Sequence, residues 1–174
     1  KRLRPLLLLA TAELFHVDRE TAIRVATAIE AIHVYSLIHD DLPAMDNDDL
    51  RRGQPTVHRA FDEAAAILAG DGLLAFAFDI LANEETELPD RIKLRLVAAL
   101  SRAAGIGGMV GGQTLDLEAE QNKPDEAGII RLQAMKTGAL IRFAATAGPL
   151  RTPRLPRRAL AALTDYGDAL GLAF

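Results

Sequence analysis

Apolar residues recur along this chain at spacings of three and four positions rather than in alternation, which predicts helices almost everywhere. Alanine and leucine, both strong helix formers, dominate these stretches, and aromatic residues make up only 5% of the chain. The predicted helices are 6–15, entered through Pro5, then 20–39, capped by Asp18, then 58–81, 90–120 with a glycine-rich interruption, 126–147 and 157–174. We therefore expect an all-α protein.

The spacing also predicts which positions are buried. The core candidates of the second helix are Ile23, Ala26, Ala28, Ile29, Ile32 and Leu37. Gly70 and Gly72 lie inside the third predicted helix, where each costs about 1 kcal/mol relative to Ala, so we expect close packing there. Glycines at 105, 107, 108, 111 and 112 predict a break in the fourth helix.

Composition narrows the classes of protein. A hydrophobic content of 49% over 174 residues is enough for the core of one domain. The 20 basic and 24 acidic residues give a formal charge of −4, which argues against a general nucleic-acid binder. The chain has no Cys, which excludes disulfides, a thiolate nucleophile and zinc-thiolate sites.

The length of the apolar runs indicates whether the chain has a membrane span or a signal peptide. No uninterrupted run approaches about 18 apolar residues, so we expect no membrane span, no signal peptide and a cytoplasmic protein. Both ends lie in helix-like sequence without caps. We therefore expect one domain over residues 1–174 that is a fragment, truncated at both ends.

An acidic cluster stands where the second helix is expected to end at Pro43. Its members are Asp40, Asp41, Asp46, Asp48 and Asp49. Carboxylates crowded in this way suit Mg²⁺, which takes one or two of them and completes its octahedron with water and phosphate. A solvated acidic loop is the alternative. Residues 42–55, rich in Asp, Arg, Gly and Pro, are expected to form a structured loop.

Two further features favour a diphosphate site over a solvated loop. Arg51 and Arg52 follow the acids immediately, and guanidinium groups bind phosphate oxygens in bidentate fashion. Seven residues make almost two full helical turns, so His33 lies close to the same helix face as Asp40 or Asp41. Asp40 and Asp46 cannot share a helix face, because six residues rotate by about 240°, so the loop must bulge to bring both into one site.

Separated motifs in a fixed order give the sequence a family resemblance. They are Lys1-Arg-Leu-Arg4-Pro5, Asp40-Asp-Leu-Pro-Ala-Met-Asp46, Arg51-Arg52-Gly53, Gly112-Gln113-x-x-Asp116 and Lys136-Thr137-Gly138. Together they resemble the trans-isoprenyl diphosphate synthases, and within that family the bacterial farnesyl diphosphate synthases. The resemblance covers all 174 residues and implies an isoprenoid-synthase helical bundle. It also implies a Mg²⁺-dependent prenyltransferase that condenses dimethylallyl and geranyl diphosphates head to tail with isopentenyl diphosphate.

The resemblance assigns roles to residues at the matching positions. Asp40 and Asp46 would hold magnesium with support from Asp41. The allylic diphosphate would be bound by Arg51, Lys136 and Thr137, with Gln113 and Asp116 lining the region where it ionises. Isopentenyl diphosphate would be bound by Lys1, Arg4, His33 and Arg52.

Product length and assembly are also implied by resemblance. Tyr35 and Ser36, just before Asp40, would form the floor of the chain-length pocket, and the bulk of Tyr35 favours a fifteen-carbon product over a twenty-carbon one. The resemblance also implies a homodimer. The family's second aspartate-rich arm is not within this sequence, so residues 1–174 alone are expected to be inactive.

Three other functions compete with a farnesyl or geranylgeranyl diphosphate synthase. A metal phosphohydrolase is suggested by the His39-Asp40 doublet, but the chain has no His after position 58 to supply further ligands. A non-catalytic partner subunit would not need Asp40, Asp46, Arg51 and Lys136. A terpene cyclase of the same fold would leave Arg4 and Arg52 without isopentenyl diphosphate to bind.

Overall fold

The computed structural model describes residues 2–151 and 155–174 and confirms the all-α class, with one small hairpin added. The helices of the first half are α1 (Leu3–Leu14), α2 (Arg19–Asp40), α3 (Val57–Ala60), α4 (Glu63–Ala82) and α5 (Asp90–Ala104), with β1 (Leu50–Arg51) and β2 (Gln54–Pro55) before α3. The second half has α6 (Met109–Gln121), α7 (Glu126–Gln133), a π-helical turn η1 (Ala134–Gly138), α8 (Ala139–Ala147), a 3₁₀ turn η2 (Gly148–Arg151) and α9 (Arg157–Ala173).

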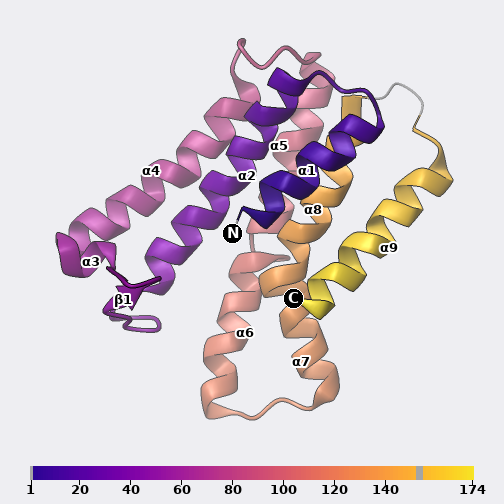
Figure 1. Cartoon of the computed structure of the whole chain (residues 1–174). Helices are drawn as coiled ribbons and strands as arrows, with labels where there is room; N and C mark the ends of the chain where they lie inside the picture. Colours follow the sequence, from indigo (N-terminus) through magenta and orange to yellow (C-terminus); the bar gives the residue numbers. More distant parts are fainter. Residues whose placement is uncertain (1, 152–154) are drawn as a thin grey trace.

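Helix α2 runs through the middle of the bundle, between α1 and α4, while α8 packs against α1, α5 and α9 (Figure 1). The predicted core positions Ala26, Ala28, Ile29 and Ile32 are buried, but Ile23 is 43% exposed, so that prediction was wrong. The buried residues of α2 follow the three- and four-residue spacing that passes through Ala22 and Ile29, and Ile23 falls outside it. Leu37 is only half-buried because it lines the cavity described below.

Aspartate side chains cap the N-termini of α2 and α4. The carboxylate of Asp18 accepts a hydrogen bond from the Thr21 amide at 2.9 Å, which confirms the predicted cap of α2. The single helix predicted over 58–81 was wrong, because the chain breaks at Phe61 and Asp62 into α3 and α4. Asp62 caps the new helix by accepting from the Ala65 amide at 2.7 Å, so a capping residue overrides an otherwise apolar helical pattern.

The two glycines of α4 differ in their surroundings. Gly70 is buried, and a Cβ atom there would meet the ring of His39, which confirms the predicted close packing. A Cβ atom on Gly72 would have nothing within 4 Å, so the same prediction was wrong at that position.

The segment 42–55 is the structured loop that the sequence predicts. Leu50 pairs with Pro55 and Arg51 with Gln54 in an antiparallel hairpin. The two central residues, Arg52 and Gly53, have φ of 54° and 79°, as a two-residue hairpin turn of type I′ requires. This turn holds the arginine pair beside the end of α2.

The helix predicted over 126–147 is continuous but irregular, because α7 and α8 are joined through the π-helical turn η1. Such turns are rare and occur frequently at functional sites. Gly112 of α6 lies against the backbone of η1, where a Cβ atom would be 2.1 Å from the amide nitrogen of Lys136. Helices α6 and α7 extend together beyond the rest of the bundle (Figure 1).

By length and average composition, three stretches are apolar enough to cross a membrane: Arg19–Asp40, Glu63–Ala82 and Asp90–Gln121. The sequence analysis counted only uninterrupted apolar runs. The mean hydropathy of a helical window is a less strict criterion, because it tolerates scattered polar residues. Half of the window in Arg19–Asp40 is buried inside the protein, against 28% in each of the other two. Much of the apolar surface of α2 is thus used by the bundle core.

Candidate functional site

A cavity of about 420 Å³ opens at the C-terminal end of α2, between α2, α6 and η1. Eight of the predicted site residues line it: Arg4, His33, Tyr35, Ser36, Asp40, Gln113, Lys136 and Thr137. These residues come from four elements that are distant in sequence, which the fold brings to one place. Lys1 lies outside the described residues.

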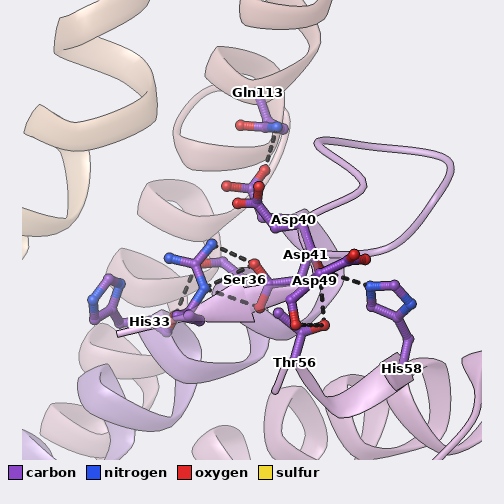
Figure 2. Close-up of polar contacts among 10 residues, drawn as sticks. His33, Ser36, Asp40, Asp41, Asp49, Thr56, His58 and Gln113 are labelled. Carbon is purple, nitrogen blue, oxygen red and sulfur yellow. Dashed lines mark hydrogen bonds and ion pairs between the residues drawn. The ribbon is translucent and has the colours of Figure 1, made fainter. Parts of the chain in front are cut away.

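The acidic wall of the cavity is built on Asp40. The loop after α2 turns back so that the Asp46 amide donates to the Asp40 carbonyl oxygen at 2.9 Å, which provides the bulge that the sequence requires. The Gln113 amide donates to the Asp40 carboxylate at 2.5 Å, and so links α2 to α6 (Figure 2). Burial raises the pKa of Asp40 to about 6 against the pull of Lys136, and the nearby Asp46 carboxylate adds to the rise.

This wall fits a divalent cation. Asp40 is partly desolvated beside a second carboxylate, and a cation would relieve both penalties. Among the residues that the structure describes, no three His, Cys, Asp or Glu side chains gather closely enough to hold a metal by themselves. Two carboxylates nevertheless suffice for Mg²⁺, which takes its remaining oxygen ligands from water and phosphate.

Asp41 has a different environment from Asp40. Its side chain is 4% exposed, and both of its oxygens accept from the Arg51 guanidinium, at 2.5 to 2.9 Å. Asp41 is not among the residues that line the cavity, and in the structure its partner is Arg51; its supporting role at the metal stays a prediction. The ion pair raises the pKa of Arg51 and fixes its guanidinium beside the acidic wall.

The hairpin that carries Arg51 is held by a small polar network (Figure 2). The Thr56 hydroxyl donates to the Asp48 carbonyl oxygen at 2.8 Å, and the His58 ring nitrogen lies 2.9 Å from the same oxygen. Both side chains are buried. Arg59 pairs with Asp49 at 2.5 Å on the exposed side. Two of the five acids of the cluster therefore serve the loop rather than the cavity.

A second part of the lining, the cationic wall, is formed by Arg4 and His33. Arg4 is buried, and its Nε has no hydrogen-bond partner in the structure. Burial lowers the pKa of His33 to about 4, and the charges of Arg4, Arg52 and Arg51 lower it further. Burial is the largest cause of this shift, and the three guanidinium groups around the ring add a local positive charge that suits an anion such as a diphosphate.

The π-helical turn supplies the third side of the cavity. Lys136 and Thr137 both line it, and Lys136 forms an ion pair with Asp116 across from α6. Asp116 itself is not among the lining residues, and its contact in the structure is with Lys136; its place in the region where the substrate ionises stays a prediction. Asp46, Arg51 and Arg52 lie on the loop outside the cavity wall.

Sequence reasoning missed several lining residues. They are His39, Met45, Met109, Val110, Thr114 and Leu117, with Leu37 predicted only as a core residue. One signal was available: Met109, Gln113 and Leu117 recur every four residues, which places them on one face of α6. His39 and Met45 gave no comparable signal, because their place depends on α4 and on the turn of the loop.

A family model described as polyprenyl synthetase matches residues 1–174. The chain is 51% identical to the farnesyl diphosphate synthase of Escherichia coli (strain K12), an alignment that covers 100% of this chain and 58% of that protein. It is 44% identical to the chloroplastic geranylgeranyl pyrophosphate synthase 3 of Arabidopsis thaliana, covering 100% of this chain and 49% of that one.

Solved structures agree with the fold. An FPP/GFPP synthase from Zymomonas mobilis superposes with a TM-score of 0.95 at 54% identity, covering 99% of this chain and 63% of that one. A geranyltransferase from Helicobacter pylori, complexed with magnesium and isoprenyl diphosphate, superposes with a TM-score of 0.92 at 36% identity. It is matched over 100% of this chain and 59% of its own. The chain thus spans about 60% of the length of these bacterial proteins, and it belongs to the polyprenyl synthetase family.

Proposed function

We propose that the whole protein is a Mg²⁺-dependent prenyltransferase. It condenses dimethylallyl and then geranyl diphosphate with isopentenyl diphosphate, and it makes farnesyl diphosphate. The observation that carries this proposal is that one cavity is lined by an acidic group, Asp40, by cationic surroundings at Arg4 and His33, and by apolar side chains such as Met109 and Leu117. Such a cavity accommodates two anionic heads and a hydrocarbon tail.

The acidic wall would bind the allylic diphosphate through metal. Asp40 and Asp46 would hold Mg²⁺, which would supply neutralisation of the charge on the departing diphosphate. Arg51, oriented by Asp41, adds a cationic contact at the same head group. Lys136, oriented by Asp116, and Thr137 complete this side from the π-helical turn.

The cationic wall would bind isopentenyl diphosphate. The unpartnered Nε of Arg4 is available to a phosphate oxygen, and the neutral ring of His33 can donate one N–H. Arg52 adds charge from the hairpin turn, and Lys1 is proposed for the same role. Gln113, whose amide holds Asp40, lies on the cavity wall where the allylic carbon ionises.

The chemistry requires no protein nucleophile. The allylic C–O bond breaks and its electron pair leaves with diphosphate. The double bond of isopentenyl diphosphate then forms the new C–C bond, and the released diphosphate accepts the proton that restores a double bond. The side chains supply orientation and charge stabilisation, which are worth most in a site shielded from water.

An assay of the whole protein tests the proposal. Isopentenyl and dimethylallyl diphosphates with Mg²⁺ should yield farnesyl diphosphate on chromatography, and EDTA should abolish the product. A predominantly twenty-carbon product would favour the geranylgeranyl alternative. A complete absence of prenyl product would favour the non-catalytic partner subunit and overturn the proposal.

Tyr35 provides a prediction about product length. Tyr35 is 6% exposed, and both Tyr35 and its neighbour Ser36 line the cavity. We propose that both form the floor of the tail pocket. Tyr35→Ala removes an aromatic ring from that floor, so the share of products of twenty carbons or more should rise at least tenfold, as expected for a pocket enlarged beyond one methylene. Chromatography of the products measures it, and an unchanged chain length would exclude the floor role.

Helices α4 and α5 carry exposed apolar side chains. Leu68 and Phe76 of α4 and Leu94 of α5 are 69%, 49% and 69% exposed, an apolar surface that a second copy would cover. We propose a homodimer, located in the cytoplasm without a membrane span. Light scattering of the whole protein should give twice the chain mass, and Leu68→Lys with Phe76→Lys should give the monomer. A monomeric wild type would refute the homodimer.

A further inference from the structure

His39 is a cavity residue to which the proposed function gives no role. It stands one turn after Tyr35 on α2, and the two rings meet edge to face with centroids 5.7 Å apart and planes at 78°. Both rings line the cavity. His39 therefore extends the aromatic surface that Tyr35 begins.

Helix α4 fixes the His39 ring from behind. Nε2 donates to the Ile67 carbonyl oxygen at 3.0 Å, since a carbonyl can only accept. The ring also fills the space that a side chain at Gly70 would take: a Cβ atom there would lie 2.0 Å from Nε2, 2.4 Å from Cδ2 and 2.8 Å from Cε1. The absence of a side chain at Gly70 is thus what allows the imidazole to lie against α4.

The position of the ring between α4 and the cavity sets the direction of any displacement. Of the described residues that line the cavity, none comes from α4. A side chain added at position 70 must push the imidazole away from α4, and the space on its other side is the cavity with Tyr35. The His39 ring, seated in the notch at Gly70, therefore bounds the cavity on the side of α4.

We propose that His39, seated against Gly70, is a specificity-determining residue that limits the length of the bound hydrocarbon tail together with Tyr35. This inference rests on the proposed function, because it assumes that the cavity holds a prenyl tail. It predicts opposite effects for the two residues of the contact: filling the notch shortens the accepted tail, and removing the ring lengthens it.

The test measures binding, which does not depend on turnover. Unreactive thiolodiphosphate analogues with tails of ten, fifteen and twenty carbons are titrated into the whole protein with Mg²⁺. Gly70→Ala should shift the ratio of ten- to fifteen-carbon affinity by about tenfold toward the shorter tail, the effect of a methyl-sized change in an apolar pocket. His39→Ala should shift the fifteen- to twenty-carbon ratio by a similar factor toward the longer tail.

Two variants make the result decisive. Gly72→Ala lies on the same helix with nothing within 4 Å of its Cβ atom, so its ratios should equal those of the wild type. The double variant Gly70→Ala with His39→Ala removes the clash, so it should lose the preference for the short tail even where Gly70→Ala alone is poorly folded. Unchanged ratios in His39→Ala and in the double variant would overturn the inference. Measurable analogue binding without any product in the assay would instead contradict the proposed reaction.

Discussion

Replacing Asp40 by Asn should reduce prenyl transfer by roughly 10³-fold and at the same time stabilise the protein. The loss follows because Asn keeps the acceptor for Gln113 but removes the negative charge that would hold the metal at the departing diphosphate. The matched control is Asp48→Asn. Asp48 belongs to the same acidic cluster, but its backbone carbonyl is what Thr56 and His58 contact. Its turnover should stay within a few-fold of the wild type.

The stabilisation follows from the sign of the pKa shift at Asp40. Its folded-state pKa, about 6, is above the ordinary value of 3.8, so the folded protein binds the proton more tightly than the unfolded chain. The stability associated with this proton is fully present below pH 3.8 and is lost as the pH rises through 6. Above that pH the wild type carries the penalty and Asp40→Asn does not.

The size of the effect is set by that shift. Each unit corresponds to about 1.36 kcal/mol, and allowing for the partial exposure of Asp40 we expect a gain of about 1–2 kcal/mol at pH 8. Urea denaturation with EDTA, of variant and wild type at pH 4.5 and 8, measures it. The gain should be much smaller at pH 4.5 than at pH 8. A variant that is equally stable or less stable at pH 8 would show that Asp40 is not under electrostatic strain.

The second large effect is expected at Gly112, where α6 meets the π-helical turn. A Cβ atom at this position would be 2.1 Å from the Lys136 amide nitrogen and 2.5 Å from the Lys136 Cα. These are backbone atoms, so no rotamer change can relieve the clash and the two segments must separate. Gly112→Ala should therefore destabilise the protein by about 2–3 kcal/mol, despite the better helix propensity of Ala.

Thermal denaturation of Gly112→Ala and of the wild type measures the loss of stability as a difference in melting temperature. For a chain of this size we expect a decrease of roughly 5–10 °C, together with weakened diphosphate binding because Lys136 moves with its backbone. Gly72→Ala is the matched control, since it makes the same substitution in an open helical position and should gain about 1 kcal/mol. If Gly112→Ala melts at or above the wild-type temperature, α6 does not rest on the π-helical turn as the structure has it.

The sequence by itself determined the helical class, most helix ends and the list of charged residues that could form the site. These follow from local physics: apolar spacing selects the buried face of α2, Asp18 caps it through a hydrogen bond three residues away, and Pro43 keeps the helix from continuing. The order of the motifs indicated the family, which comparison confirmed.

Only the tertiary structure decided which side chains face one another. Sequence spacing left Asp40 and Asp41 equivalent, and the structure separates them because Gln113 of α6 holds one while Arg51 of the hairpin holds the other. The two glycines of α4 read alike in sequence, yet Gly70 receives the ring of His39 and Gly72 faces open space. The physical reason is the same in both cases: these differences arise from contacts between different elements, ten or more residues apart, and local propensity carries no information about them.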